Sequence, residues 1–262
     1  MKALLLAFVL LGSIPIPTFR VGAIQNAPPS PQKPSEAPQL TQDTQQLGLH
    51  GPVPAEAVFK DMDIFKGKAA ERLMPAMQAI SGSLGVPCVY CHTQYEWEKN
   101  DKPPKQTARK MFRMIGFINE KYFPGENKVS CWTCHRGHPE QGMPPKDAPQ
   151  LAEKFIHVDP ADENKPAQEV FHNIQSLKGI PAGRFPLIMN FFSNSLGVQC
   201  SHCHVPDQWE RDDKETKKTA RKMLHMVTDI IHTFYGNQGQ IGCYGCHEGA
   251  IKPELMASQK KN

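Results

Sequence analysis

The sequence Cys88-Val89-Tyr90-Cys91-His92 places two cysteines and a histidine close together in the chain. The same Cys-x-x-Cys-His spacing occurs three more times, beginning at Cys131, Cys200 and Cys243. In a helical turn, residues i, i+3 and i+4 project from one face. Two thiols can then bond to the vinyl groups of a haem while the imidazole reaches the iron from the same side. The pattern predicts four sites of covalent c-type haem attachment.

Every cysteine in the chain belongs to one of these pairs, and a histidine follows each pair directly. A disulfide needs no histidine at that position, and zinc sites usually close four ligands over shorter gaps than those between the pairs. The predicted covalent attachment sites are Cys88, Cys91, Cys131, Cys134, Cys200, Cys203, Cys243 and Cys246. The predicted proximal iron ligands are His92, His135, His204 and His247.

The composition is lean in apolar residues, with 39% hydrophobic residues among 262. Such a chain is poorly supplied for a self-sufficient core, and four porphyrins would provide the missing apolar bulk. The net charge is +4 without a block of basic residues, which argues against nucleic acid as a partner.

The first residues predict export from the cytoplasm. Met1-Lys2, an apolar run over 3–11 and the small-residue pattern Val21-Gly22-Ala23 are typical of a secretory signal peptide. No later segment offers roughly 18 consecutive apolar residues, as a membrane helix needs. No cysteine precedes Cys88, so a lipid anchor on an N-terminal cysteine is not expected. We expect a periplasmic protein, with peripheral association with the outer face of the inner membrane as an open alternative.

The chain contains an internal duplication, in which residues 58–138 match residues 170–250 without a gap. For example, Ser-Leu-Gly-Val occurs at 83–86 and again at 195–198. The predicted organisation is a signal peptide (1–23), a flexible leader rich in proline and glutamine (24–55), a first dihaem repeat (56–140), a linker (141–167), a second dihaem repeat (168–250) and a C-terminal tail (251–262).

Each repeat has a helical pattern. In the first repeat, we predict a helix over 68–80, stopped by Ser81-Gly82-Ser83 and by the glycine and proline of 85–87. A second, amphipathic helix is predicted over 105–122. No segment shows the alternation of a sheet. The predicted fold is therefore all-α, a tandem duplication of a two-haem helical unit.

A methionine lies ahead of each motif at matching positions in the two repeats. The proposed distal iron ligands are Met77, Met111, Met189 and Met223. Met114 and Met226 also match, so repeat symmetry does not choose between them and their neighbours Met111 and Met223. A methionine at helical spacing also suits core packing. The paired placement before every motif favours ligation, and predicts low-spin haems with reduction potentials above those of bis-histidine haems.

Other residues admit two interpretations. The basic residues on the second helix of each repeat could pair with haem propionates or an acidic partner, or could form a solvated helix face. These residues are Lys105, Arg109, Lys110, Lys217, Lys218, Arg221 and Lys222. Trp97 and Trp209 could pack on porphyrin or in an ordinary core. Surface or supporting roles are expected for the histidines without a repeat mate, His138, His157, His172, His225 and His232, and His202 is poorly placed to reach its own iron.

The chain resembles the tetrahaem cytochrome subunit of photosynthetic reaction centres. The resemblance rests on Leu-Lys-Gly-Ile-Pro-Ala-Gly-Arg-Phe at 177–185, on Thr-Ala-Arg-Lys-Met at 107–111 and on Cys-x-x-Cys-His-Arg-Gly at 131–137, and it covers about residues 56–250. It implies a helix, a turn and a second helix around each haem, and a row of haems that returns electrons to the photo-oxidised chlorophyll pair. It also favours Met111 over Met114 and, by the repeat, Met223.

In that family, a histidine shortly before the second motif commonly ligates the fourth haem, but residues 122–130 contain none. The resemblance therefore leaves Met223 as the expected fourth distal ligand, with His225 or His172 as substitutes. The expected function is single-electron transfer between donor and acceptor proteins, the partner being a reaction centre or a soluble donor. The alternatives are a free periplasmic respiratory carrier and a multihaem reductase with one open haem.

Overall fold

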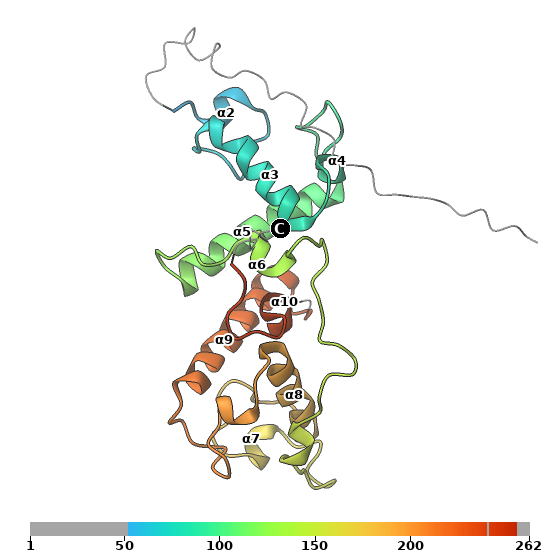
Figure 1. Ribbon diagram of the computed structural model, residues 1–262, viewed down its shortest axis with the longest axis vertical. Coiled ribbons are helices and arrows are strands. Elements are labelled where there is room, and N and C mark those ends of the chain that lie inside the picture. Colours follow the sequence, from blue (N-terminus) through green and yellow to red (C-terminus); the bar gives the residue numbers. More distant parts are fainter. Residues whose placement is uncertain (1–51, 240, 256–262) are drawn as a thin grey trace, which may run out of the picture.

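The computed structural model describes residues 52–239 and 241–255, and these fold into an elongated array of helices (Figure 1). The predicted signal peptide, nearly all of the predicted leader and the end of the tail lie outside the described residues. The extended pairings in the described ranges are isolated bridges, such as Pro54 with Ala69 and Pro166 with Pro181. The predicted all-α fold with a tandem duplication is confirmed.

The two repeats contain the same elements in the same order. The first contains α2 (Ala55–Val58), η1 (Ala70–Arg72), α3 (Leu73–Leu84), α4 (Cys88–Cys91), α5 (Pro103–Tyr122) and α6 (Cys131–His135). The second contains α7 (Ala167–Val170), η3 (Ala182–Arg184), α8 (Phe185–Leu196), η4 (Cys200–His202), α9 (Glu215–Tyr235) and α10 (Cys243–His247). Helices α2 and α7 begin one residue before the predicted starts of the repeats, and the domain bounds stay predictions.

The first predicted helix differs from the observed one at both ends. Helix α3 begins at Leu73, after the 3-10 turn η1, and continues through Ser81-Gly82-Ser83 to Leu84. The expected break at these residues is wrong, because the Ser83 hydroxyl donates to the Ala79 carbonyl at 2.7 Å and so remains compatible with the helix. The helix does end before the first cysteine, at Gly85 in the left-handed conformation.

Gly85 also fixes the second motif of the repeat. A Cβ atom at Gly85 would lie 2.0 Å from the carbonyl oxygen of Gly137, and the Gly137 N–H donates to the Ser83 carbonyl at 2.8 Å. The matching glycines of the second repeat, Gly197 and Gly249, make the same close approach, at 2.1 Å. The helix before the first motif is therefore held against the turn of the second motif in both repeats.

The second predicted helix is confirmed in its extent to Tyr122. Helix α5 begins at Pro103, whose missing N–H costs nothing in the first turn of a helix. Its apolar side packs against α9, where Met114, Ile118 and Ile230 are buried. Phe117 and Phe234 add an edge-to-face contact with ring centroids 5.6 Å apart. This cluster joins the two repeats.

Matching residues of the repeats also meet at the contact between α6 and α10. The Sγ atoms of Cys134 and Cys246, which are 112 residues apart, lie 2.6 Å from each other. Arg136 forms an ion pair with Glu248, with its Nη1 atom 2.7 Å from Oε2, and its Nη2 atom donates to the Cys246 carbonyl at 2.7 Å. We call this contact the junction; it relates the repeats by an approximate two-fold axis.

The predicted linker packs on the second repeat. Its 3-10 turn η2 (Ala152–Lys154) lies against α8, where the buried Asn190 side chain accepts from the Ala152 N–H at 2.7 Å and donates to the Gln150 side chain at 2.7 Å. Asn194 donates to the Pro149 carbonyl at 3.0 Å. These bonds give this part of the linker a fixed place on α8.

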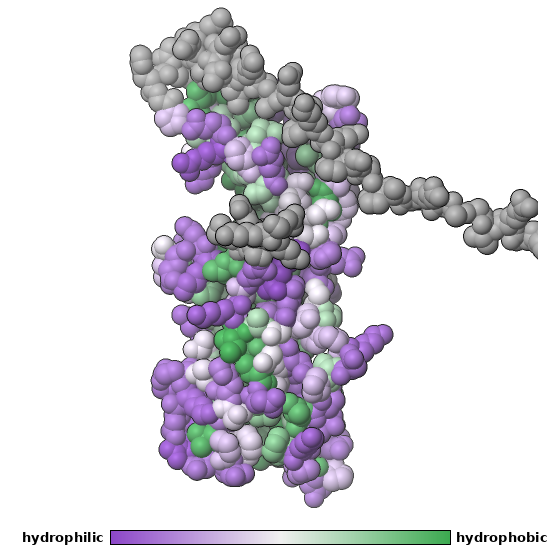
Figure 2. Space-filling model, in the orientation of Figure 1, coloured by the Kyte–Doolittle hydropathy of each residue, from purple (hydrophilic) through white to green (hydrophobic). Residues whose placement is uncertain are grey.

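The buried core is small for a chain of this length. Much of it consists of alanines, and Ile230 is the only large aliphatic residue among the side chains with under 2% exposure in the described ranges. Hydrophobic residues also reach the surface between hydrophilic ones on the face shown in Figure 2. The polypeptide thus leaves much of its apolar surface without protein partners.

Exchange of Gly85 for alanine tests the glycine contact. We expect Gly85→Ala to lower the free energy of unfolding by about 1–3 kcal/mol from backbone strain, with a further loss from the clash with the Gly137 carbonyl. The control is Gly82→Ala in the same helix, where a Cβ meets nothing within 4 Å and where we expect a gain of about 0.5–1 kcal/mol. Thermal unfolding measures both; equal effects of the two substitutions would contradict the role of Gly85.

The ion pair at the junction can be reversed, because Arg136 and Glu248 occupy matching positions, both in the left-handed region. We expect Arg136→Glu to place two carboxylates together and to lower the free energy of unfolding by about 1–3 kcal/mol. The double variant R136E/E248R should recover most of that loss. Denaturant unfolding of the purified protein measures both, and additive losses in the double variant would contradict the pairing.

Candidate metal and cofactor sites

Each of the four motifs forms a short helical turn. The turns are α4, α6, η4 and α10, and each places its two cysteines three residues apart, directly followed by the histidine. At α6, the start of the turn is fixed by Ser130 and Thr133, since the Ser130 N–H donates to the Thr133 hydroxyl at 3.0 Å. The helical turn expected from the spacing includes the histidine at α6 and α10, whereas α4 ends at Cys91 with His92 in an extended conformation and η4 ends at His202.

Each of the four motif histidines is held by a hydrogen bond from its Nδ1 atom to a backbone carbonyl. His92 Nδ1 lies 2.8 Å from the Trp97 carbonyl and His204 Nδ1 lies 2.9 Å from the Trp209 carbonyl. His135 and His247 bond in the same way to carbonyls three residues later, at 3.0 and 2.9 Å. An Nδ1–H that donates to a carbonyl leaves Nε2 as a free lone pair, which is the arrangement of a metal-binding histidine.

Burial favours the neutral form of two of the motif histidines and of two of the motif cysteines. Desolvation lowers the pKa of His135 and His204, which keeps both imidazoles uncharged at neutral pH. Burial likewise raises the pKa of Cys131 and, to about 11, that of Cys243. These cysteines stay as thiols, which carry the hydrogen that addition to a vinyl group requires.

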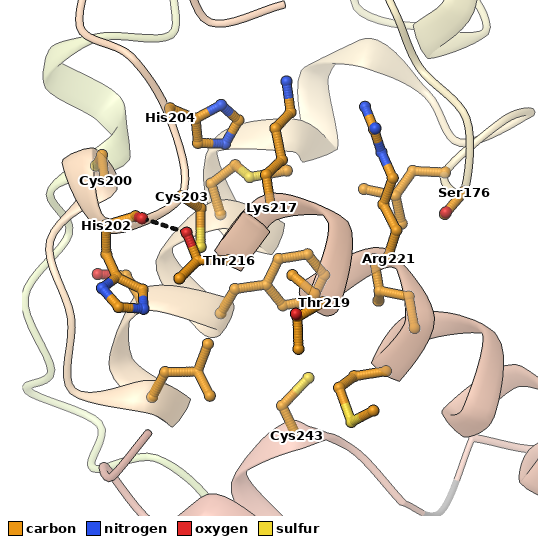
Figure 3. Close-up of a pocket in the computed structure, with 18 of the residues that line it drawn as sticks. Ser176, Cys200, His202, Cys203, His204, Thr216, Lys217, Thr219, Arg221 and Cys243 are labelled. Carbon is orange, nitrogen blue, oxygen red and sulfur yellow. Dashed lines mark hydrogen bonds between the residues drawn. The ribbon is translucent and has the colours of Figure 1, made fainter. Parts of the chain in front are cut away.

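A cavity of about 560 Å³ connects the two motifs of the second repeat. Cys200, Cys203, His204 and Cys243 lie around it, with Thr216, Lys217 and Arg221 reaching in from α9 (Figure 3). Mostly apolar side chains line it, including Met189, Met223, Met226 and Phe192. Its volume lies within the range of about 300–1,000 Å³ for cofactor pockets. Thiols and imidazoles of both motifs of the second repeat therefore face one mostly apolar cavity.

A second cavity, of about 250 Å³, lies in the first repeat. Cys131, Cys134 and His135 line it together with Met111 and Met114. The structure therefore brings Met111 to the cavity of His135 and brings Met189 and Met223 to the cavity of His204 and His247. Met77 and His92 line neither of these two cavities.

Met111 and Met114 differ in burial, although both line the smaller cavity. Met114 is only 4% exposed and lies in the buried cluster between α5 and α9. Met111 is less buried, and the Tyr235 hydroxyl lies 3.8 Å from its Sδ atom. Met111 packs against the same cluster from a less buried position, and both methionines line the smaller cavity, so Met111 as the ligand stays a prediction. In the second repeat, Met223 and Met226 both line the cavity.

Of the remaining histidines in the described ranges, His232 is exposed on α9, and the others line the larger cavity or make contacts elsewhere. His157, His172 and His202 line the larger cavity. His225 Nε2 is 3.4 Å from the Ser176 hydroxyl, and His138 supplies the carbonyl that accepts from His135. His138 acts through its backbone carbonyl, so the type of its side chain could not predict this role. Its position three residues after His135 is the only indication in the sequence.

Two of the basic residues on α5 and α9 point inward. Lys105 and Lys217 are each only 8% exposed, and they bond to the loops that follow the first motif of each repeat. A solvated helix face is therefore wrong for these two lysines. Lys218 pairs with Glu215 and Lys222 is exposed, as a solvated face predicts. Arg109 and Arg221 pair with Asp61 and Asp212.

Comparison with known proteins identifies relatives along the whole array. The family model of the photosynthetic reaction centre cytochrome C subunit matches twice, over residues 21–143 and 141–262. The reaction center cytochrome c subunit of Thermochromatium tepidum is 25% identical, with 79% of this chain and 63% of the relative covered. The subunit from Rubrivivax gelatinosus is 23% identical, with 79% and 70% covered, and cytochrome c-554 of Chloroflexus aurantiacus is 26% identical, with 76% and 70% covered.

This chain thus spans less than two thirds of the length of the Thermochromatium tepidum relative. In the described ranges, none of the helices combines the length and the apolar character that crossing a bilayer requires.

A pair of methionine substitutions tests which residue of α5 is a ligand. We expect Met111→Ala to remove the sulfur-to-iron charge-transfer band of one haem and to make that haem high-spin. Met114→Ala should leave the spectrum unchanged and should lower the free energy of unfolding by about 2–5 kcal/mol, as truncation in a core does. Absorption spectra and thermal unfolding of the two variants measure this; a spectral change in Met114→Ala alone would reverse the assignment.

Proposed function

The chain belongs to the family of the photosynthetic reaction centre cytochrome c subunit, and we propose that it is a periplasmic tetrahaem electron carrier. The observation that carries the proposal is the recurrence of one arrangement at four places: a helical turn with two thiols and a histidine fixed through Nδ1. A haem c bound at each place would supply a one-electron iron couple.

The protein groups have distinct roles in this proposal. The cysteine pairs anchor the haems covalently, and the four motif histidines bind iron from the proximal side. Met77, Met111, Met189 and Met223 bind from the distal side. Haems held by a protein side chain on each side of the iron would supply one-electron couples with little rearrangement of the protein. The proposed carrier needs no general acid, general base or nucleophile, and we do not propose an enzymatic activity.

The contacts at the junction support a linear order of sites. The turns α6 and α10 meet there, so the sites of His135 and His247 are neighbours at the centre of the molecule (Figure 1). The sites of His92 and His204 lie on the outer sides of these two. The order that we propose along the molecule is the first, second, fourth and third motif of the sequence.

For the fourth site, Met223 remains the proposed distal ligand. Residues 122–130, which carry no histidine, contribute Val129 to the larger cavity next to Met223, Cys243 and His247. An aliphatic side chain from this segment cannot replace the missing ligand. His172 lines the same cavity and is the substitute that a spectrum of Met223→Ala would reveal.

We propose a photosynthetic reaction centre as the electron acceptor, since the names of two relatives, at 25% and 23% identity, refer to that complex. The protein would be exported by its signal peptide and would associate with the outer face of the inner membrane. The alternative is a free periplasmic carrier, and the experiment must distinguish it from a protein that delivers electrons to a reaction centre.

Haem content and electron delivery test the proposal. We expect the purified protein to retain its colour in acid acetone and to exceed the polypeptide mass by four haems. Four one-electron transitions should appear in a potentiometric titration. Loss of the colour on extraction would overturn the proposal. With reaction-centre membranes, flash excitation should oxidise the protein; oxidation by a soluble acceptor alone would favour the free carrier.

A further inference from the structure

The proximal histidines of the two outer sites share a feature that the inner sites lack. In the first repeat, the Trp97 carbonyl accepts from His92 Nδ1 at 2.8 Å and also from Lys105 Nζ at 2.8 Å. In the second repeat, the Trp209 carbonyl accepts from His204 Nδ1 at 2.9 Å and from Lys217 Nζ at 2.8 Å. One oxygen atom therefore links an imidazole to an ammonium group in each case.

The inner sites use plain carbonyls. His135 donates to the His138 carbonyl and His247 to the Ala250 carbonyl. Among the hydrogen bonds of the described residues, none joins an ammonium group to either of these oxygens. The four sites thus fall into an outer pair and an inner pair that differ in the group behind the histidine.

The two lysines are held as charged groups. Lys105 Nζ also bonds to the Lys99 carbonyl at 2.9 Å and to Asp61 at 3.1 Å. Lys217 Nζ also bonds to the Arg211 carbonyl at 2.7 Å and pairs with Asp212 at 3.3 Å. An ammonium group has three donors: those of Lys105 have three acceptors, and those of Lys217 have two carbonyl acceptors beside the ion pair with Asp212. Both lysines therefore have fixed positions behind their histidines.

The acidic partners come from different places in the two repeats. Asp61 of the first repeat corresponds to Asn173 of the second, and Asp212 of the second corresponds to Asn100 of the first. In each repeat the aspartate also pairs with an arginine, Arg109 or Arg221. Both repeats thus assemble one lysine, one arginine, one aspartate and one asparagine, with a net charge of +1. The aspartate and the asparagine occupy opposite positions in the two repeats.

The acids are ionised at neutral pH. Hydrogen bonds from Arg221 and Asn173 hold the pKa of Asp212 well below its ordinary value. Partial burial opposes ionisation of Asp61, but hydrogen bonds from Arg109 and Lys105 outweigh it and lower its pKa. Two cations and one carboxylate therefore lie behind each outer histidine, which leaves a net charge of +1 there.

We propose that Lys105 and Lys217 are positioning residues that raise the reduction potentials of the two outer haems, an inference that rests on the proposed function. An ammonium group draws electron density from the shared carbonyl, which makes that oxygen a weaker acceptor for the histidine Nδ1–H. The imidazole then donates less charge to iron, and the positive charge itself favours the reduced state. The outer sites differ from the inner sites in this respect.

Opposite charge changes in the second repeat test the inference. In Lys217→Met, the ratio of reduced to oxidised haem at fixed potential should fall about tenfold for one of the four transitions, equal to about 59 mV. In Asp212→Asn, which keeps Lys217, the same transition should move in the opposite direction by a few-fold. The control Lys222→Met removes an exposed charge from the same helix and should change every transition by less than about twofold.

Spectroelectrochemical titration gives the potentials, and haem content and thermal unfolding are measured on the same samples. If Lys217→Met loses stability while all four potentials stay in place, Lys217 only clamps the loop and the inference is wrong. If Lys217→Met does not accumulate, the absence of a rise in Asp212→Asn overturns the inference. Failure of the proposed function would appear separately, as wild-type protein without covalent haem.

Discussion

Two thiols and an imidazole must lie close together to serve one planar cofactor, and the rest of the molecule holds four short turns that carry these groups. The glycine contacts join the turn of each second motif to the helix before the first motif. The buried lysines tie the loop after each first motif to the long helix that follows. The packing of α5 on α9 then fixes the two repeats against each other.

This construction explains why so little of the chain forms an ordinary core. Large side chains that would fill a core in another protein instead line the cavities around the motifs, as Met189 and Phe192 do. A covalent cofactor both fills such a cavity and joins two points of the chain, which stabilises a scaffold with few buried side chains of its own. The polypeptide is therefore best understood as a holder whose apolar surfaces face the cofactor.

The sequence predicted the fold class, the duplication and the turns, because these depend on spacing and local periodicity. It failed on the ends of α3, since the serine–glycine stretch is compatible with a helix once the serine hydroxyl bonds inside it. It could not distinguish Met111 from Met114, because both lie on one side of α5 and only the packing of α9 decides which is buried. The inward direction of Lys105 and Lys217 depends on carbonyls in a loop, which carry no signal in residue type.

The junction has an implication for the origin of the chain. In a dimer of identical halves, a position beside the two-fold axis carries the same residue on both sides, so two arginines or two glutamates would face each other there. The Arg136–Glu248 pair places unlike residues at matching positions, which requires two halves of different sequence, and a single chain with two repeats supplies them. Two repeats in one chain can thus carry opposite charges at matching positions, and each repeat can diverge in its own way.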